Sequence, residues 1–307
     1  METIFLLAGG DRRQFWLSRS LVSRGRVFTL GVPGLEDSRP DRPADVLILP
    51  TPCLNAAGLL RGPGEGLDPA ALEGLYNEHT RVYGGALPGD IRERLTGCGP
   101  VAELLADPAV GAANGRLTAE AAVALAAERR EGSLFGLNCL VLGFGRVGKP
   151  LAALLDGLHA RVAVAARRPG VRAEAAQLGY SVRDFTISEA FPLGGRCPSA
   201  HTGADEGVLR QQQPDIVFNT VPAQALSQRS LDALGPDCLW VELASAPGGL
   251  PEGYRPAFAV LPANSLPGRR LPRSAAAVLL EGILRRERDM VGADAHIGPR
   301  SQEEIGR

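Results

Sequence analysis

The chain has 307 residues, 45% of them hydrophobic, and a formal net charge of −1. The length favours two domains, and the near-neutral charge speaks against a polyanion such as nucleic acid as a partner. Aromatic residues make up only 5%, which also disfavours a surface that stacks on single-stranded nucleic acid. The five cysteines form no CxxC pair. We therefore expect no zinc site and no disulfide framework, but reduced thiols in a cytoplasmic protein.

The amino-terminal part alternates apolar runs with helical patterns. The apolar run at 3–10 ends on glycines and predicts the first strand. No basic residues precede it, so the pattern does not indicate a signal peptide. A helix follows up to Gly25, and further strands are expected at 26–32 and 44–52. The stretch 53–75 is rich in glycine and proline and predicts a loop with a short helix. This order is typical of a parallel sheet covered by helices.

A second domain begins with the pattern of a strong helix at 117–132. Strands and helices alternate after it, interrupted by an aperiodic stretch at 186–213 that predicts an insertion or a mobile loop. No apolar run approaches the ~20 residues of a membrane span. We expect two α/β domains joined by two long helices, with the active site in the cleft between the domains. The expected boundaries are 1–116 plus 273–290 for the first domain, 117–272 for the second and 291–307 for a disordered tail.

Gly143, Gly145 and Gly148 fit the pattern G-x-G-x-x-G between an apolar strand and a helix, and a second apolar strand follows at the right distance. In a Rossmann dinucleotide-binding domain the first glycine permits a tight turn, the second lets the backbone approach a pyrophosphate, and the third packs helix on strand. The helix N-terminus then faces the anion. The pattern therefore predicts a dinucleotide site, to which Arg146 and Val147 of the same turn would also belong.

The choice of cofactor depends on the end of the second strand. An NAD site places a carboxylate there for the ribose, whereas this chain has Ala166, Arg167 and Arg168. Guanidinium groups pair with phosphate, so we predict NADP. NAD remains the alternative, because Lys149 is the only lysine and the abundance of arginine could place these two by chance. Later strand ends complete the expected cofactor set with Asn219, Thr220, Val221, Pro222, Ala244 and Ser245.

Further motifs resemble the dipicolinate synthase A family of spore-forming bacteria. They are AGGDRRQ near the start, NGRLTAEAAV at 114–123, VLGFGRVGKPLA, the strand end AARR, FNTVPA, VELASAPGG at 240–249 and SLPGRRLPRSAA at 265–276. They occur in the family's order over about residues 3–288. The chain departs from the family at 190–207, which is longer, at 53–75, which is hard to match, and at Glu242, where Asp is expected.

The resemblance implies a flavodoxin-like substrate domain beside the Rossmann domain, in a layout related to the 2-hydroxyacid dehydrogenases. It also implies an NAD(P)-dependent oxidoreductase of sporulation that forms dipicolinate from a dihydro- or hydroxytetrahydro-dipicolinate. The implied partner is a flavoprotein-like second subunit, dipicolinate synthase B, and a homodimer is an arrangement that this layout often adopts.

Such a reaction needs cations for the two carboxylates of a small substrate, and a base. We expect the substrate to contact Gly10, Arg12, Arg13, Asn114, Thr118, Arg269 and Arg273. Thr118 could instead be only the N-cap of its helix, with Glu120 in the first turn. Glu120 and Asp11 are the candidate bases; among the histidines only His79 is placed plausibly.

Two other functions are open. A 2-hydroxyacid-type dehydrogenase would want a catalytic histidine late in the nucleotide domain, and the chain has none between 202 and 295. A non-catalytic NADP-binding subunit, whose partner carries out the redox chemistry, agrees with the lack of an evident base. No cluster with metal-ligand spacing is present, so no metal is expected.

Overall fold

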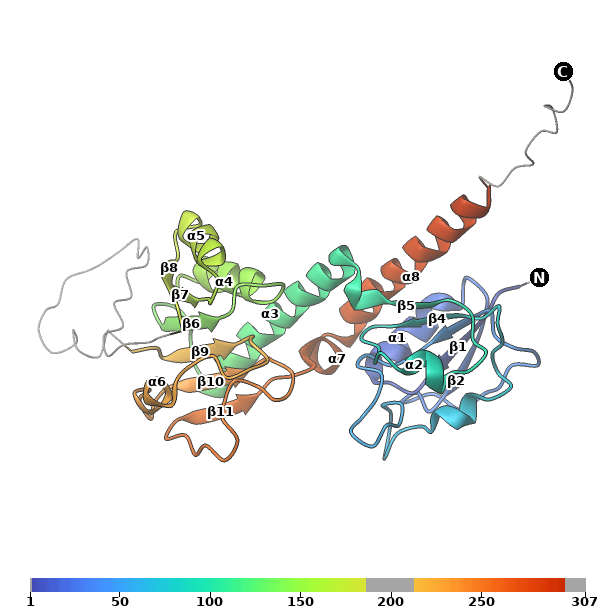
Figure 1. The fold of residues 1–307 in the computed structure, drawn as a ribbon, viewed down its shortest axis with the longest axis horizontal. Helices are drawn as coiled ribbons and strands as arrows, with labels where there is room; N and C mark the ends of the chain where they lie inside the picture. Colours follow the sequence, from blue (N-terminus) through green and yellow to red (C-terminus); the bar gives the residue numbers. More distant parts are fainter. Residues whose placement is uncertain (1, 186–212, 296–307) are drawn as a thin grey trace, which may run out of the picture. The chain divides into compact units, whose positions relative to one another are not determined.

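The structure is a computed structural model that describes residues 2–185 and 213–295 (Figure 1). By its internal contacts the chain forms two compact units. Unit 1 comprises Met1–Gly111 with Pro272–Arg307, and unit 2 comprises Ala112–Leu271. The predicted boundaries were 116 and 272. The aperiodic stretch at 186–213 lies, apart from its last residue, outside the described residues.

Unit 1 is built on a sheet of five parallel strands in the order β2-β1-β3-β4-β5. This is the flavodoxin-like order, so the predicted fold class is confirmed for this unit. Parallel strands are buried on both faces, which explains the continuous apolar runs that predicted them. The strands are β1 Ile4–Ala8, β2 Arg26–Leu30, β3 Val46–Ile48, β4 Arg81–Gly84 and β5 Val101–Glu103.

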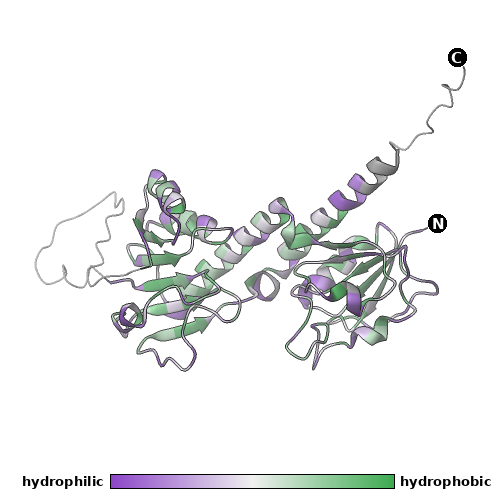
Figure 2. Cartoon of the chain, in the orientation of Figure 1, coloured by the Kyte–Doolittle hydropathy of each residue, from purple (hydrophilic) through white to green (hydrophobic). Residues whose placement is uncertain are grey.

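The two faces of this sheet carry different covers. Leu7 and Ile48 face a layer formed by Leu17 of α1 and by Leu279 and Ile283 of α8. Their strand neighbours point the other way, because side chains alternate along a strand, and pack on the loop and short helices between 53 and 95. Figure 2 shows the strands as the most hydrophobic part of the unit. Its helices are α1 Arg12–Leu21, η1 Pro69–Leu72, α2 Ile91–Arg94, η2 Leu104–Ala106 and α8 Pro272–Ala295.

Helix α8 is longer than predicted. It continues through Val291–Ala295, which we had expected to begin a disordered tail. This segment contains no proline, and its single glycine, Gly292, costs only about 1 kcal/mol relative to alanine and does not stop a helix. The remaining residues of the predicted tail, 296–307, lie outside the described part of the chain.

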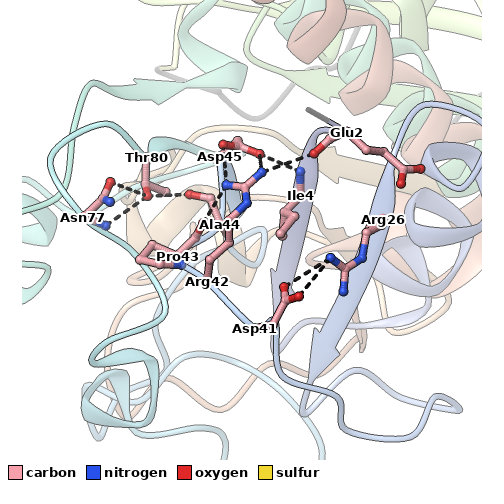
Figure 3. A network of polar contacts seen from close by, with 10 residues as sticks. All are labelled: Glu2, Ile4, Arg26, Asp41, Arg42, Pro43, Ala44, Asp45, Asn77 and Thr80. Atoms are coloured by element: carbon pink, nitrogen blue, oxygen red, sulfur yellow. Dashed lines mark hydrogen bonds and ion pairs between the residues drawn. The ribbon is translucent and has the colours of Figure 1, made fainter.

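A polar network fastens the start of β1 to the segment that leads into β3 (Figure 3). Arg42 donates to both carboxylate oxygens of Asp45 at 2.9 and 2.8 Å, and the backbone N–H of Ile4 donates to the same carboxylate at 2.7 Å. The hydrogen bond from Arg42 is the main reason that the pKa of Asp45 is lowered, and the Ile4 N–H adds to it. The ionised carboxylate therefore stabilises the fold.

The substitution Asp45→Asn should destabilise unit 1 by about 1 kcal/mol at pH 7, since it breaks charge-assisted hydrogen bonds. A carboxylate with a lowered pKa contributes stability above its unfolded pKa and loses that contribution as the pH falls through its folded pKa. The gap between wild type and variant should thus close below about pH 4. Chemical unfolding at pH 7 and pH 3 measures this difference in unfolding free energy. Asp41→Asn, at the exposed Arg26 pair of Figure 3, is the control and should change almost nothing. A gap that is independent of pH would contradict the interpretation.

Unit 2 has a sheet of six parallel strands in the order β11-β10-β9-β6-β7-β8. Counted from β6, this is the Rossmann order 3-2-1-4-5-6, as predicted. The point where the strand order reverses lies between β6 and β9, next to the glycine turn. The strands are β6 Asn138–Leu142, β7 Arg161–Ala165, β8 Ser181–Arg183, β9 Ile216–Asn219, β10 Leu239–Glu242 and β11 Ala259–Pro262.

The predicted start of the first long helix is wrong. Helix α3 spans Pro108–Arg130, and Asp107 accepts hydrogen bonds from the N–H groups of Ala109 and Val110 at 2.9 and 3.2 Å. Thr118 is therefore in the interior of the helix, not at its N-cap, and its hydroxyl donates to the carbonyl of Asn114 at 2.8 Å. The remaining helices of unit 2 are α4 Gly148–Gly157, α5 Pro169–Gln177, α6 Gln228–Asp232 and α7 Leu266–Arg270.

Gly115 lies inside α3 and does not end the helix. Helix α3 passes very close to the glycine turn at this residue. A Cβ at position 115 would overlap the carbonyl oxygen of Arg146, so only glycine fits. The glycine thus serves packing and does not end a helix. Within 2–185 and 213–295, no helix is both long and apolar enough to cross a membrane.

Candidate functional site

The glycine turn between β6 and α4 has three glycines in three different environments. Gly143 has φ +90°, and a Cβ there would lie 2.5 Å from the Thr220 hydroxyl oxygen. A Cβ at Gly148 would overlap the carbonyl oxygen of Gly143, so α4 packs directly on the turn. A Cβ at Gly145 would meet no atom within 4 Å. The turn therefore requires two of the glycines for its own shape, while Gly145 leaves open space where a ligand can approach the backbone.

A cavity of about 450 Å³ adjoins this turn at the carboxyl ends of the strands. Seven residues of the predicted cofactor set line it: Gly143, Gly145, Ala166, Arg167, Arg168, Val221 and Pro222. The lining residues that the sequence analysis missed are Phe144, Val171, Phe185, Ala223, Gln224 and Ala225. They are mostly apolar, as the walls of a site for an aromatic ring would be. Phe144 lies within the glycine pattern, at a position that the pattern leaves open, and the other five lie outside it, so the motif gives no signal for them.

The polar character of the cavity comes from its arginines. Ala166 is buried at the end of β7, whereas Arg167 and Arg168 are exposed and line the cavity. Among the described residues that line the cavity there is no aspartate or glutamate, and the first turn of α5, which follows directly, contains no acidic residue. The positive end of the α5 dipole adds to the charge of the two guanidinium groups. This part of the cavity is therefore positively charged and offers guanidinium groups to a ligand.

Other predicted cofactor residues support the site without lining it. Asn219 is fully buried: its amide N–H₂ group donates to Val221 and to Glu242 at 3.0 and 2.7 Å, and its amide oxygen accepts from the Val221 N–H at 3.1 Å. The Thr220 hydroxyl donates to the carbonyl of Leu142 at 2.7 Å. Both side chains thus make hydrogen bonds within the fold, and a contact of Asn219 or Thr220 with the cofactor stays a prediction. Also outside the lining are Arg146, Val147, Gly148, Ala244 and Ser245.

Glu242, which departs from the aspartate expected in the family, accepts four hydrogen bonds through its carboxylate. Its carboxylate accepts hydrogen bonds from Asn219 and from the Ala244 N–H through Oε1, at 2.7 and 3.1 Å. It accepts from the Trp240 indole and the Gly249 N–H through Oε2, both at 3.0 Å. One half-buried carboxylate therefore holds the ends of two strands and the 244–249 loop.

The substitution Glu242→Gln should destabilise the protein by about 2 kcal/mol, because the amide would turn an N–H₂ group towards N–H donors that need an acceptor. Thermal or chemical unfolding measures this. Glu252→Gln is the matched control: Glu252 is exposed in the same segment, and its substitution should leave stability within about 0.5 kcal/mol of wild type. Equal effects of the two substitutions would show that the carboxylate does not hold the loop.

The predicted substrate residues of unit 1 gather after β1, but two of them have other roles. Arg13 is buried; its guanidinium bonds to Asp11 at 2.7–3.1 Å and to the carbonyl of Thr51. Asp11 also caps α1 by accepting the Arg13 N–H at 2.9 Å. The N–H of Gly10 donates to the carbonyl of Arg61, so it is not available to a ligand. Gly10, Arg13 and Asp11 are thus already engaged within the fold, and their roles towards a substrate stay predictions. Arg12 is exposed.

The other predicted substrate residues are spread over the chain. Arg273 lies over the ring of Trp16 at 5.4 Å, in unit 1. Arg269 is exposed on α7, and its neighbour Arg270 pairs with Glu128 at 2.9 Å. Asn114 and Thr118 belong to the interior of α3, and Glu120 lies on the exposed stripe of that helix. A substrate role for Arg12, Arg269, Arg273 and Glu120 stays a prediction.

Of the two histidines in the described part of the chain, His79 and His159, neither lines the cavity. His79 is exposed and lies 3.6 Å from Glu78, and His159 packs edge-on against Phe135. Among the residues that the structure describes, no group of three or more His, Cys, Asp and Glu side chains could hold a metal ion. The geometry at the glycine turn therefore offers binding groups and no evident base.

Comparison with known proteins tests the resemblance to the dipicolinate synthase A family. No protein-family model matches the chain. Dipicolinate synthase A of Bacillus subtilis (strain 168) is 30% identical over 164 residues, which cover 53% of this chain and 49% of the relative. Over that stretch the chain is similar to dipicolinate synthase A. The aligned stretch spans about half the length of that relative.

The solved structures of dipicolinate synthase A extend the likeness to nearly the whole chain. The structure from Bacillus halodurans has a TM-score of 0.73 at 23% identity and covers 92% of this chain and 97% of its own. The structure from Bacillus subtilis has a TM-score of 0.72 at 22% identity, with 96% and 98% covered. The resemblance predicted from the motifs is thus confirmed, and the two-sheet α/β fold is that of dipicolinate synthase A.

Proposed function

We propose that this chain binds NADP, in preference to NAD, in the cavity at the glycine turn. The observation that carries the proposal is the pair Arg167 and Arg168 in the cavity lining, with no carboxylate among the lining residues that the structure describes. Gly145 leaves room for the pyrophosphate, and Gly143 and Gly148 hold the turn and the α4 N-terminus in place. The residues present therefore fit a dinucleotide with an additional phosphate on its ribose. When bound, the cofactor supplies a hydride acceptor.

The reaction that we propose is the oxidation of a dihydrodipicolinate, or of its hydroxytetrahydro precursor, to dipicolinate. It is supported by the relative's name and by the motifs that flank the cofactor site. Aromatisation removes a hydride and a proton, and the two carboxylates of the substrate require cations. Arg12, Arg269 and Arg273 are exposed arginines without a carboxylate partner within hydrogen-bond distance among the described residues, so they are the candidates for that role.

A second candidate function is an NADP-binding subunit that acts only together with the flavoprotein-like dipicolinate synthase B. It is favoured by a specific observation: neither Glu120 nor Asp11 lines the cavity, and neither do the histidines of residues 2–185 and 213–295. The 2-hydroxyacid-type dehydrogenase has no such support, since the chain has no histidine between 202 and 295.

The purified chain tests both candidates. Titration with each cofactor should show NADP bound at least about tenfold more tightly than NAD, as expected for a phosphate held by arginine. With NADP and dihydrodipicolinate, the ultraviolet absorbance of dipicolinate should rise with the chain alone. A rise only after dipicolinate synthase B is added would select the second candidate. If neither cofactor binds, the proposed function is wrong.

A further inference from the structure

A third arginine lies behind the two that line the cavity. Arg172 is half-buried at the end of the first turn of α5, outside the lining. Its Nη1 atom donates to two successive backbone carbonyls, of Ala166 at 2.8 Å and of Arg167 at 2.7 Å. One guanidinium group therefore ties the segment between β7 and α5 to the helix that follows it.

The same segment is fixed from its other side by the sheet. The N–H of Ala166 donates to the carbonyl of Arg183 at 3.0 Å, and the N–H of Gly143 donates to the carbonyl of Ala165 at 2.8 Å. The segment is thus held by β8, by the glycine turn and by Arg172. Because both exposed arginines project from it, their direction depends on these contacts, and only the contact made by Arg172 comes from a side chain.

The contact also changes the charge around the cavity. The carbonyl oxygens at the end of a parallel strand carry partial negative charge and repel a phosphate. Arg172 covers two of them with a cation that is itself partly shielded from water, where its charge is screened less than at the surface. The two exposed guanidinium groups can then act on a phosphate without opposition from the backbone from which they project.

We propose that Arg172 is a positioning residue for cofactor choice: by holding the carbonyls of Ala166 and Arg167 it directs Arg167 and Arg168 to the 2′-phosphate of NADP. This inference rests on the proposed NADP site. It assigns no contact between Arg172 and the cofactor. The preference for NADP over NAD therefore depends on Arg172, whereas the affinity for NAD does not.

The test is a titration of Arg172→Gln with NADP and with NAD, next to the unfolding midpoint of each variant. The ratio of the two affinities should fall about tenfold, the loss expected when charge-assisted hydrogen bonds disappear, with NAD affinity nearly unchanged. Arg172→Lys keeps the charge and the donors, and should recover most of the ratio. Arg161→Gln, at the amino end of β7, is the matched control and should keep it.

The possible outcomes separate this inference from the proposed function. If wild type prefers NADP and Arg172→Gln keeps that ratio, or loses both affinities in parallel, Arg172 is only a structural residue and the inference is overturned while the NADP site stands. If wild type binds neither cofactor, both are overturned. A fall in the ratio that Arg172→Lys restores supports the inference.

Discussion

Replacing Gly148 by alanine is expected to destabilise the protein by about 2–3 kcal/mol, the cost of forcing an extra group into a packed backbone contact. A Cβ at this position would overlap the carbonyl oxygen of Gly143. That oxygen belongs to the backbone of the turn, so it cannot move aside as the end of a flexible side chain could. Either α4 must shift outward or the turn must open.

The same shift should remove dinucleotide binding. The N-terminus of α4 and the open space at Gly145 are positioned by the contact between Gly148 and Gly143. We expect the affinity for NADP to fall on the order of hundredfold, that is ~2.7 kcal/mol. Chemical unfolding and an NADP titration, both carried out on the same preparation, measure the two effects.

Gly157→Ala is the matched control, because it makes the same change in the same helix. A Cβ at Gly157 would meet no atom within 4 Å. Alanine there should be neutral or stabilise by about 0.5–1 kcal/mol, since glycine is the poorer helix former. It should leave NADP affinity unchanged. Wild-type stability and affinity in the Gly148→Ala variant would show that the helix does not rest on the turn as described.

The arrangement of the sheets could be predicted because apolar runs and glycine-rich strand ends carry a strong signal. The strands β1, β6 and β9 are fully buried, and each coincides with an apolar run in the sequence. The glycine pattern between an apolar strand and a helix is typical of a Rossmann domain. It therefore predicts the strand order of that fold. Strand β8 was not predicted, because three half-buried residues leave no pattern.

Gly115 is required because the backbone of Arg146, far away in the sequence, packs against it. Sequence alone does not show this contact, so Asn114 and Gly115 do not reveal where α3 starts. The correct signal was Asp107–Pro108, an N-cap residue followed by a first-turn proline.

The arginines show the limit of sequence reasoning at the site. Arg12 and Arg13 are adjacent and identical in type, yet one is exposed and the other is buried against Asp11 and the carbonyl of Thr51. Arg172 gave no signal, because its partners are two carbonyls and any residue type has a carbonyl. A motif identifies which residues could bind a ligand, whereas the contacts decide which of them the fold has already used.

The choice of NADP is the central claim, and the double substitution Arg167→Asp with Arg168→Asn tests it. Both side chains are exposed, so the fold should tolerate the change. The variant loses two cations beside the expected 2′-phosphate and gains a carboxylate that can accept from the ribose hydroxyls of NAD. We expect the preference for NADP over NAD to fall at least about hundredfold and to reverse.

Arg129→Asp is the control for a change of charge alone. Arg129 is an exposed arginine of the same unit that lines a different pocket, beside Asp237 and the first residues of β10 and β11. It should keep the wild-type preference.

The decisive measurement is the ratio of the NAD and NADP dissociation constants for wild type and for the double variant, determined at one salt concentration. Tighter NADP binding by wild type and tighter NAD binding by the variant are the predicted result. An unchanged ratio would contradict the assignment of Arg167 and Arg168, and with it the NADP site.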